Sequence, residues 1–392
     1  MAAFYLSRAG IPSLILEKTS FPRPKVCGDI LTSNVLRAIH EAEPDWMQDL
    51  INQPWTMNLE ATAFGGTKKA GFVMPFNSPS NQAMGLPSCL TARRHDFDHW
   101  LFEKVKAEPL VEILEDCPVK SIRKKGEGFV LESKQGEFAA SYLLLATGAN
   151  SPLTKMLVPG QEILPRHSAV GLRMYFKNSE PHAQKSLSEY YLFDRKFMPG
   201  GLYVTPFSDG GVNVNAVMRL DTFNKRRPKL QELAMDFLNA HPELGPRFMN
   251  AEQEGAAAGC TLFFGTKRRP ISAGNCLLLG DAAGLTDATN ANGIGHAMIS
   301  GQIAAKRVVA AIAAGMEISG YDEAVFARLR NSLKAGRVMK SLFANPLTAG
   351  ISVAVLNASL NRINSKAVEE LVYSANTTKT LLRPGFYWRL LK

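Results

Sequence analysis

The sequence predicts an α/β fold, with a Rossmann-like nucleotide-binding domain, an interleaved β-rich domain and a helical C-terminal region. In residues 277–284 an apolar strand runs into Gly-Asp-Ala-Ala-Gly, and a helix-like run follows. Short β-rich stretches dominate residues 164–265, whereas residues 315–392 are mainly helical and basic in pattern. Strands that alternate with helices are typical of a parallel sheet with helices on both faces.

The first 17 residues have the pattern of the middle of a nucleotide-binding unit. Residues 1–10 read as a helix end closed by Gly10, and residues 11–16 as a buried parallel strand that ends at Glu17. In a dinucleotide-binding βαβ unit, the acid that binds ribose lies about 20 positions after the glycine-rich phosphate loop. We therefore expect this chain to lack the first strand and the glycine-rich loop. The alternative is a complete domain in which residues 1–17 form a helix and an edge strand.

The middle of the chain alternates between the two predicted domains. Residues 57–90 alternate strand and turn patterns, and residues 95–106 form a predicted helix. After a predicted central strand, Gly148 allows the backbone to approach a dinucleotide closely. A further helix is expected near 227–239, and strands at 111–114, 119–124, 129–134, 137–145, 169–177, 188–194, 201–207 and 211–219.

The segment 277–284 is the strongest sign of a flavin site. It places Asp281, after Gly280, at a strand end, where a carboxylate can hydrogen-bond the hydroxyls of a ribityl chain. Gly293 and Ile294 then open the helix-like run 296–314, whose first N–H groups favour the negative charge of a reduced flavin. The alternative is an ordinary buried strand, turn and helix.

These patterns divide the 392 residues among interleaved domains, and that length suits more than one core. We predict an FAD-binding domain made of residues 1–56, 91–163 and 266–314, a substrate domain made of residues 57–90 and 164–265, and a helical C-terminal region over residues 315–392.

The amino-acid composition indicates a globular protein and excludes a disordered one. Hydrophobic residues make up 46% and charged residues 20% of the chain, as in globular rather than disordered proteins. The five cysteines have no paired spacing, which indicates neither a disulfide framework nor a metal site, and no secretory signal is visible. We expect a cytoplasmic protein.

The net charge of +10 suits peripheral membrane contact better than nucleic acid, since no nucleic-acid motif is present. Basic clusters occupy residues 225–227 and 267–269, and the tail combines basic residues with Phe-Tyr-Trp at 386–388. The apolar run 342–360 is interrupted by polar residues and a proline, which argues against a membrane span. The alternative is that the excess charge is only a solvated surface. The oligomeric state is not indicated.

Residues 1–45, 94–101, 146–151 and 274–301 resemble the geranylgeranyl reductase family of flavoproteins, within the p-hydroxybenzoate hydroxylase-like group. The likeness is greatest over residues 17–29, which read Glu-Lys-Thr-Ser-Phe-Pro-Arg-Pro-Lys-Val-Cys-Gly-Asp. The resemblance implies FAD and an external electron donor such as NAD(P)H. It places Glu17 at the adenosine ribose and Arg94 near the pyrophosphate, unless Arg93 takes that role. The implied cofactor-binding residues are Glu17, Lys18, Arg94, Gly148, Gly280, Asp281, Gly293 and Ile294.

Two segments depart from the family pattern. The family's motif of proline, tyrosine, tryptophan, phenylalanine and proline at alternating positions should fall near residues 199–206. Only the prolines and Tyr203 are retained there, and the bulky aromatics are lost at Gly201 and Thr205. The turn over residues 287–293 also differs from the family's proline, threonine, glycine, glutamate and glycine. FAD binding survives these changes because it rests largely on backbone groups, but specificity for prenyl groups does not follow.

Cys27, Tyr203 and His296 are the candidate catalytic residues. The resemblance places Cys27 in a flavin-facing loop, where a thiol can contact substrate or supply a proton; the alternative is a buried apolar role. His296, near a helix start, could donate a proton, although a structural role is the stronger alternative. Asp287 is expected to serve a turn or cap.

The predicted function is an FAD-dependent oxidoreductase that reduces or dehydrogenates an apolar, polyprenyl or lipid-like substrate by hydride transfer through the flavin. The alternative is an FAD-dependent monooxygenase of an aromatic or lipid substrate. A truncated, non-catalytic fragment is a second alternative.

Overall fold

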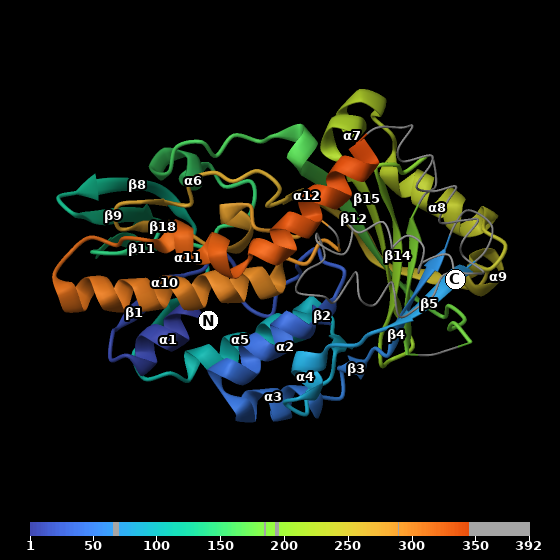
Figure 1. Cartoon of the computed structure of the whole chain (residues 1–392), viewed down its shortest axis with the longest axis horizontal. Helices are drawn as coiled ribbons and strands as arrows, with labels where there is room; N and C mark the ends of the chain where they lie inside the picture. The colour runs from blue at the N-terminus through green and yellow to red at the C-terminus, as the bar shows by residue number, and fades with distance from the viewer. Residues whose placement is uncertain (66–69, 184–185, 193–195, 289, 345–392) are drawn as a thin grey trace, which may run out of the picture.

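Figure 1 shows two groups of strands side by side, and the chain passes between them several times. The computed structural model describes residues 1–65, 70–183, 186–192, 196–288 and 290–344. One group, which we call the parallel-strand half, combines short strands with helices that include α1 (Ala2–Arg8), α5 (Arg94–Lys106) and α10 (Ile294–Ala314). The other group is a single seven-stranded sheet, which we call the large sheet. The predicted mixture of helices and sheets is therefore present.

The parallel-strand half contains two pairs of parallel strands. β1 (Ser13–Leu16) pairs with β7 (Val111–Leu114), and β11 (Leu143–Leu145) pairs with β18 (Cys276–Leu278). Within the described residues, β1 and β11 have no other strand partner, and both line the same cavity. The expected upstream strand and glycine-rich loop stay a prediction.

Shorter elements complete this half and its border with the large sheet. β17 (Ser272–Ala273) pairs with β18 in the antiparallel direction. A separate antiparallel sheet is made of β8 (Val119–Lys125), β9 (Gly128–Ser133) and β10 (Gly136–Ala140), and a third small sheet is made of β2 (Ile30–Thr32), β6 (Cys89–Thr91) and β3 (Met57–Asn58). The remaining helices here are α2 (Ser33–Ala42), α3 (Pro44–Ile51), α4 (Pro79–Gln82), α6 (Pro152–Leu157), η2 (Gly280–Ala283), α11 (Tyr321–Arg328) and α12 (Arg330–Ala344).

Helix α10 runs through the parallel-strand half (Figure 1) and packs against α1, α2 and α11. Its buried side chains, among them Met298, Ile299 and Val308, join the apolar cores around it. Gly315, at φ +63°, ends the helix in the left-handed conformation that glycine favours. By length and composition α10 is the one helix of the described residues that could cross a membrane, yet 44% of that apolar stretch is buried. In this structure it is a core helix.

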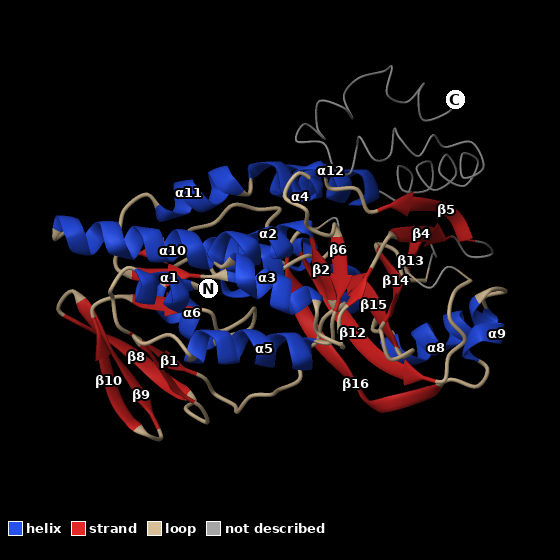
Figure 2. Ribbon diagram, turned by 90° about the horizontal axis from the view of Figure 1, so that it is seen from below, coloured by secondary structure: helices blue, strands red, loops and turns tan. Residues whose placement is uncertain are grey.

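The large sheet has the strand order β16-β12-β15-β14-β13-β4-β5. One face packs on α8 (Leu230–Ala240) and α9 (Leu244–Phe248), through an apolar core that includes Leu202, Val204 and Phe237. Figure 2 shows these helices on the side away from the parallel-strand half, so the other face of the sheet is turned toward that half. The strands are β4 (Ala61–Gly65), β5 (Ala70–Pro75), β12 (Ser168–Lys177), β13 (Leu187–Leu192), β14 (Gly200–Pro206), β15 (Val212–Arg219) and β16 (Glu252–Phe263), flanked by η1 (Pro165–His167) and α7 (Leu220–Arg226).

The structure corrects several predicted elements. Residues 137–145 form two strands, β10 and β11, rather than one, because a bend separates Ala140 from Leu143. The 12-residue strand β16 was not expected, and α10 begins at Ile294 rather than at residue 296. α11 and α12 agree with the helical pattern predicted after residue 315, whereas residues 345–392, which include the apolar run and the basic tail, lie outside the described residues. The predicted domain boundaries stay a prediction.

Candidate functional site

A long cavity of about 2230 Å³ joins the two halves. It runs between β1 and β11, passes the ends of β18 and α10, and reaches the face of the large sheet that is turned toward the parallel-strand half. Ligand cavities for drug-sized molecules are about 300–1,000 Å³, so this one has room for a dinucleotide together with a substrate.

The cavity brings together most of the residues that the sequence singled out. Cys27 and Tyr203 line it, but His296 does not. The cofactor-binding set also lines it: Glu17, Lys18, Arg94, Gly148, Gly280, Asp281, Gly293 and Ile294. Their roles stay predictions, but they share one space.

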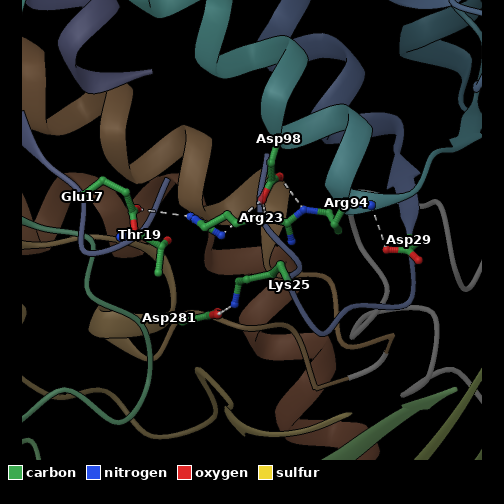
Figure 3. Close-up of polar contacts among 8 residues, drawn as sticks. All are labelled: Glu17, Thr19, Arg23, Lys25, Asp29, Arg94, Asp98 and Asp281. Carbon is green, nitrogen blue, oxygen red and sulfur yellow. Dashed lines mark hydrogen bonds and ion pairs between the residues drawn. The ribbon is translucent and has the colours of Figure 1, made fainter. Parts of the chain in front are cut away.

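Glu17 lies directly after β1 and lines the cavity, and Figure 3 shows its side chain beside Thr19 and Arg23. Its Oε1 accepts hydrogen bonds from the backbone N–H and the hydroxyl of Thr19, at 3.2 and 3.0 Å. Its Oε2 lies 3.4 Å from Nη2 of Arg23. These contacts hold the carboxylate at a strand end, where it can accept hydrogen bonds from the hydroxyls of a ribose.

Arg94 begins α5 and makes two hydrogen bonds to Asp98, one turn later in the helix, at 2.6 and 2.8 Å. The Arg94 side chain lines the cavity, whereas Arg93 points to the large sheet, where it stacks on Tyr175 and Phe207. Of the two arginines, Arg94 is therefore the one placed to reach a phosphate in the cavity.

Asp281 lies in η2, just after β18, with its carboxylate at the cavity. Its Oδ1 accepts a 3.0 Å hydrogen bond from Thr286, and its Oδ2 lies 3.5 Å from Nζ of Lys25 (Figure 3). At Gly293, which caps α10, a Cβ atom would lie 3.1 Å from Asp281 Oδ1. The carboxylate, the first N–H groups of α10 and the ammonium of Lys25 thus converge on one point.

Two glycines that line the cavity have a positive φ. Gly280 has φ +53°, and a Cβ there would come within 2.7 Å of Ala297 in α10. Gly148, after β11, has φ +79°, which L side chains rarely adopt.

This donor set fits FAD. A carboxylate at the end of β1 suits a ribose, Arg94 suits the pyrophosphate, and Asp281 beside the N-terminus of α10 suits the ribityl hydroxyls and the flavin.

Cys27 and Asp29 belong to a buried polar cluster between the halves. The Asp29 carboxylate accepts hydrogen bonds from the Tyr175 hydroxyl at 2.7 Å, from the Asn213 amide at 2.8 Å and from the Arg94 backbone N–H at 3.3 Å. Asn213 also donates to the Cys27 carbonyl at 2.9 Å. Burial raises the pKa of Asp29 to about 7, against the opposing pull of Tyr175 and Arg94. Burial also raises the pKa of the Cys27 thiol, which is therefore neutral.

Sequence reasoning assigned no role to Asp29, Tyr175 or Asn213. The one sign of this cluster in the sequence was the acidic residue Asp29, which lies in the segment 17–29 that most resembles the family. Its two partners on the large sheet carry no motif, and only the register of β12 and β15, which places Tyr175 opposite Asn213, brings them together.

The other two catalytic candidates lie in different surroundings. Tyr203, on β14, packs edge-to-face on Tyr190 with ring centroids 4.8 Å apart, and burial raises its pKa to about 12. The His296 ring is buried in α10 and contacts the Leu285 carbonyl through Nδ1 at 2.6 Å. The structure therefore favours the structural alternative for His296. Asp287 contacts Ser332 on α12 and does not line the cavity, in agreement with a structural role.

Comparison with known proteins identifies the family. The model of the FAD dependent oxidoreductase family matches residues 36–307. Menaquinone reductase of Mycobacterium tuberculosis is 25% identical over 316 residues, which cover 78% of this chain and 72% of that protein. Digeranylgeranylglycerophospholipid reductase of Thermoplasma volcanium is 24% identical over 318 residues, covering 78% and 74%.

Solved structures share the fold. A geranylgeranyl bacteriochlorophyll reductase-like protein of Thermoplasma acidophilum superposes with a TM-score of 0.73 at 18% identity, covering 99% of this chain and 91% of that one. A flavin-dependent brominase superposes with a TM-score of 0.69 at 20% identity, covering 92% and 87%. These matches confirm the predicted fold class, the predicted FAD and the resemblance to geranylgeranyl reductases. This chain belongs to the FAD dependent oxidoreductase family.

Proposed function

We propose that this protein is a reductase or dehydrogenase of an apolar, polyprenyl or lipid-like substrate, with NAD(P)H as its external electron donor. The observation that carries the proposal is the continuity of the cavity. The residues suited to FAD line one part of it, and residues of the large sheet such as Tyr190, Tyr203 and Val217 line another. The two reductases among the relatives, which are named for lipid substrates, support the same class.

FAD supplies the two-electron chemistry when it is bound. The chain supplies the site: Glu17 and Asp281 accept hydrogen bonds, Arg94 carries positive charge, and α10 presents its first N–H groups. Groups that line the cavity and hold a proton at neutral pH include the Tyr203 hydroxyl, on the large sheet, and the Cys27 thiol, because burial raises the pKa of each. Either group can donate a proton to a substrate carbon.

The test is anaerobic reoxidation of the reduced protein. We expect polyprenyl or fused-ring lipid acceptors to reoxidise the flavin faster than small polar acids do, with a saturated product recovered. Rapid turnover of a polar aromatic in air, with oxygen consumed, would favour the monooxygenase alternative. A protein that binds no flavin under any loading condition would favour the non-catalytic alternative.

Peripheral membrane contact is a second part of the proposal, because a lipid substrate must be reached at a membrane surface. Residues 225–227, at the end of α7, are exposed and basic. In the cluster 267–269, Arg268 pairs with Glu323 and stacks on Phe326. Because Arg226 donates to the Lys196 carbonyl, charge reversal of Lys225 and Arg227 is the sharper test, and we expect it to reduce co-sedimentation with anionic vesicles at low salt.

A further inference from the structure

Helix α12 carries its positive charge on one side. Arg330, Lys334 and Arg337 follow one another at spacings of four and three residues, which places them on the same side of the helix. All three are exposed, whereas Leu333 and Gly336, which alternate with them, are buried. Among the described residues, neither Arg330 nor Lys334 makes an ion pair.

Neighbouring helices add positive charge beside α12. Arg328, the last residue of α11, is exposed just before α12 begins. Arg37 of α2 lies near it, because burial and then the charge of Arg328 lower the pKa of Arg37, while Glu41 acts in the opposite direction. The two acids of α11, Asp322 and Glu323, lie at its other end and already have partners. We call the exposed set Arg328, Arg330, Lys334 and Arg337 the basic face.

The basic face is unfavourable for the isolated protein. Like charges three or four residues apart on a helix repel one another, as Arg330, Lys334 and Arg337 do. Surface helices commonly offset such cations with Asp or Glu at these spacings, but α12 contains no acidic residue between Arg330 and Ala344. An external surface of negative charge relieves this repulsion.

The opposite side of α12 is fixed against the protein. Leu333 packs so closely on Gly265 that a Cβ atom there would lie 2.5 Å from Leu333 Cδ2. A Cβ atom on Gly336 would lie 3.2 Å from the Cβ of Ala288. These contacts leave α12 no room to turn about its axis, so the basic face is directed outward.

The segment beneath α12 leads to the cavity. Asp287, which Ser332 of α12 contacts, donates its backbone N–H to the Asn292 carbonyl at 3.0 Å. Asn290, Ala291 and Asn292 line the cavity, and Asn290 is also exposed, so the cavity reaches the surface at this loop. The basic face is separated from the loop by the diameter of α12, about 10–12 Å.

A broad anionic surface is the partner that fits the basic face. Figure 2 shows α11 and α12 in line along one side of the molecule. The apolar side of α12 packs on the protein, so its exposed side binds by charge rather than by insertion, and cations beside an anionic bilayer each add to the affinity. Nucleic acid fits less well, because base stacking needs aromatic rings and the exposed residues described on α12 are Arg330, Asn331, Lys334 and Arg337.

We infer that the basic face docks on an anionic lipid bilayer and that docking brings the cavity-lining loop 290–292 close to the lipid. This inference rests on the proposed function, in which a lipid-like substrate must be reached at a membrane surface. It names a docking surface separate from residues 225–227 and connects that surface to the cavity through α12.

The test measures co-sedimentation of the FAD-loaded protein with phosphatidylcholine vesicles that contain or lack phosphatidylglycerol. We expect the double variant Arg330→Glu, Lys334→Glu to bind the anionic vesicles roughly 30-fold more weakly than the wild type. Wild-type binding should also fall with salt, because the Debye length shrinks from about 10 Å at 0.1 M to about 3 Å at 1 M. Vesicles of phosphatidylcholine alone should bind neither protein.

The matched control is the double variant Lys124→Glu, Lys125→Glu. It changes the net charge by the same amount at two exposed residues of β8, a strand that Figure 2 shows on the opposite side of the molecule from α12. This variant should keep most of the vesicle binding. Both variants should unfold at the wild-type urea midpoint, because all four residues are exposed.

Three results would overturn the inference. The first is that the wild type does not bind anionic vesicles at low salt, and the second is an equal loss of binding in the two double variants. The third is tighter binding of a double-stranded oligonucleotide than of the anionic vesicles. Turnover is judged separately in detergent, where no bilayer is present: if vesicle binding depends on the basic face but no apolar acceptor reoxidises the reduced flavin, the proposed reductase function fails while the docking surface stands.

Discussion

The carboxylate of Asp29 accepts a 2.7 Å hydrogen bond from the hydroxyl of Tyr175, on β12 of the large sheet. The same carboxylate accepts hydrogen bonds from Asn213 and from the backbone of Arg94 at the start of α5. One buried acid thus connects the loop that carries Cys27, the large sheet and the helix that carries Arg94. Asp29 has φ +59°, in the left-handed region that Asp tolerates better than most residues, so these contacts fix a bend of the loop.

Asp29→Asn should remove a pH dependence of stability between about pH 4 and 7. Burial raises the pKa of Asp29 from 3.8 to about 7 in the folded protein. The folded state therefore binds the proton more tightly than the unfolded state, and stability is lost as the pH rises through this window. Each pH unit costs the wild type about 1.4 kcal/mol. Urea unfolding at several pH values should show a steeper decline for the wild type than for the variant.

Asp49→Asn is the matched control for this titration. Hydrogen bonds from Lys104 and Trp100 lower the pKa of Asp49, so its contribution to stability changes only at acid pH. Parallel slopes for the wild type and Asp29→Asn between about pH 5 and 7 would show that Asp29 is ionised in the folded protein, contrary to the prediction.

Arg247→Met should destabilise the fold strongly. Arg247, in α9, makes two hydrogen bonds, of 2.8 and 2.9 Å, to Glu189 on β13, which also accepts from Tyr191. Glu189 is 2% exposed, so the variant leaves a buried carboxylate without its cation, at a cost of about 3–5 kcal/mol. Chemical unfolding measures the loss. Lys229→Met, which removes an exposed partner of Glu232, should leave the midpoint unchanged, and equal shifts in the two variants would contradict the prediction.

Gly280→Ala should be costly because two effects add. The residue has φ +53°, and the new methyl group would lie 2.7 Å from the Cβ of Ala297. We expect a loss of roughly 2–4 kcal/mol in urea unfolding, from backbone strain and overpacking together. Gly10→Ala shares the positive φ but has open space around it, so it should cost about 1 kcal/mol. A similar cost for both would mean that the contact with α10 relaxes freely.

The parts of the fold that could be predicted are those whose sequence pattern lies within one short segment. The glycine-containing turn after β18, the long apolar run of α10 and the acid after β1 each lie within one short segment, so Asp281, Ile294 and Glu17 could be placed at a common site. β16 could not be predicted, because residues 252–259 are polar or small. Its stability comes from pairing with β12 rather than from an apolar pattern of its own.

The rest of the site could not be predicted, because strand pairing brings its residues together from distant parts of the sequence. Gly171, Val217 and Cys260 all line the cavity, but they lie far apart in the sequence and become neighbours only when β12, β15 and β16 align. The partners of Asp29 are hidden for the same reason, since Tyr175 is 146 residues away. Neither set has a spacing that a sequence pattern can reveal.

Asp281→Ala should weaken FAD retention more than Asp287→Ala. Asp281 faces the cavity, whereas Asp287 contacts Ser332 and holds α12 against the parallel-strand half. Loss of a charged hydrogen-bond acceptor costs about 1.5–3 kcal/mol, which corresponds to a roughly 10- to 100-fold weaker dissociation constant. Flavin absorbance per polypeptide after purification measures retention. Asp287→Ala should instead lower the unfolding midpoint, and equal flavin content in the two variants would contradict the placement of Asp281.

Tyr203→Ala should change which acceptors reoxidise the flavin. The ring lies edge-to-face against Tyr190 and lines the cavity beside Thr205, so its removal opens space on the sheet side. A wider cavity favours fused-ring lipids over single-chain polyprenyl acceptors, and the ratio of their anaerobic reoxidation rates should rise. Tyr203→Phe is the matched control: it keeps the packing but removes the hydroxyl whose pKa burial raises to about 12. The Phe variant should leave the ratio unchanged and slow both acceptors if the hydroxyl donates the proton. Unchanged rates in both variants would remove Tyr203 from the substrate site.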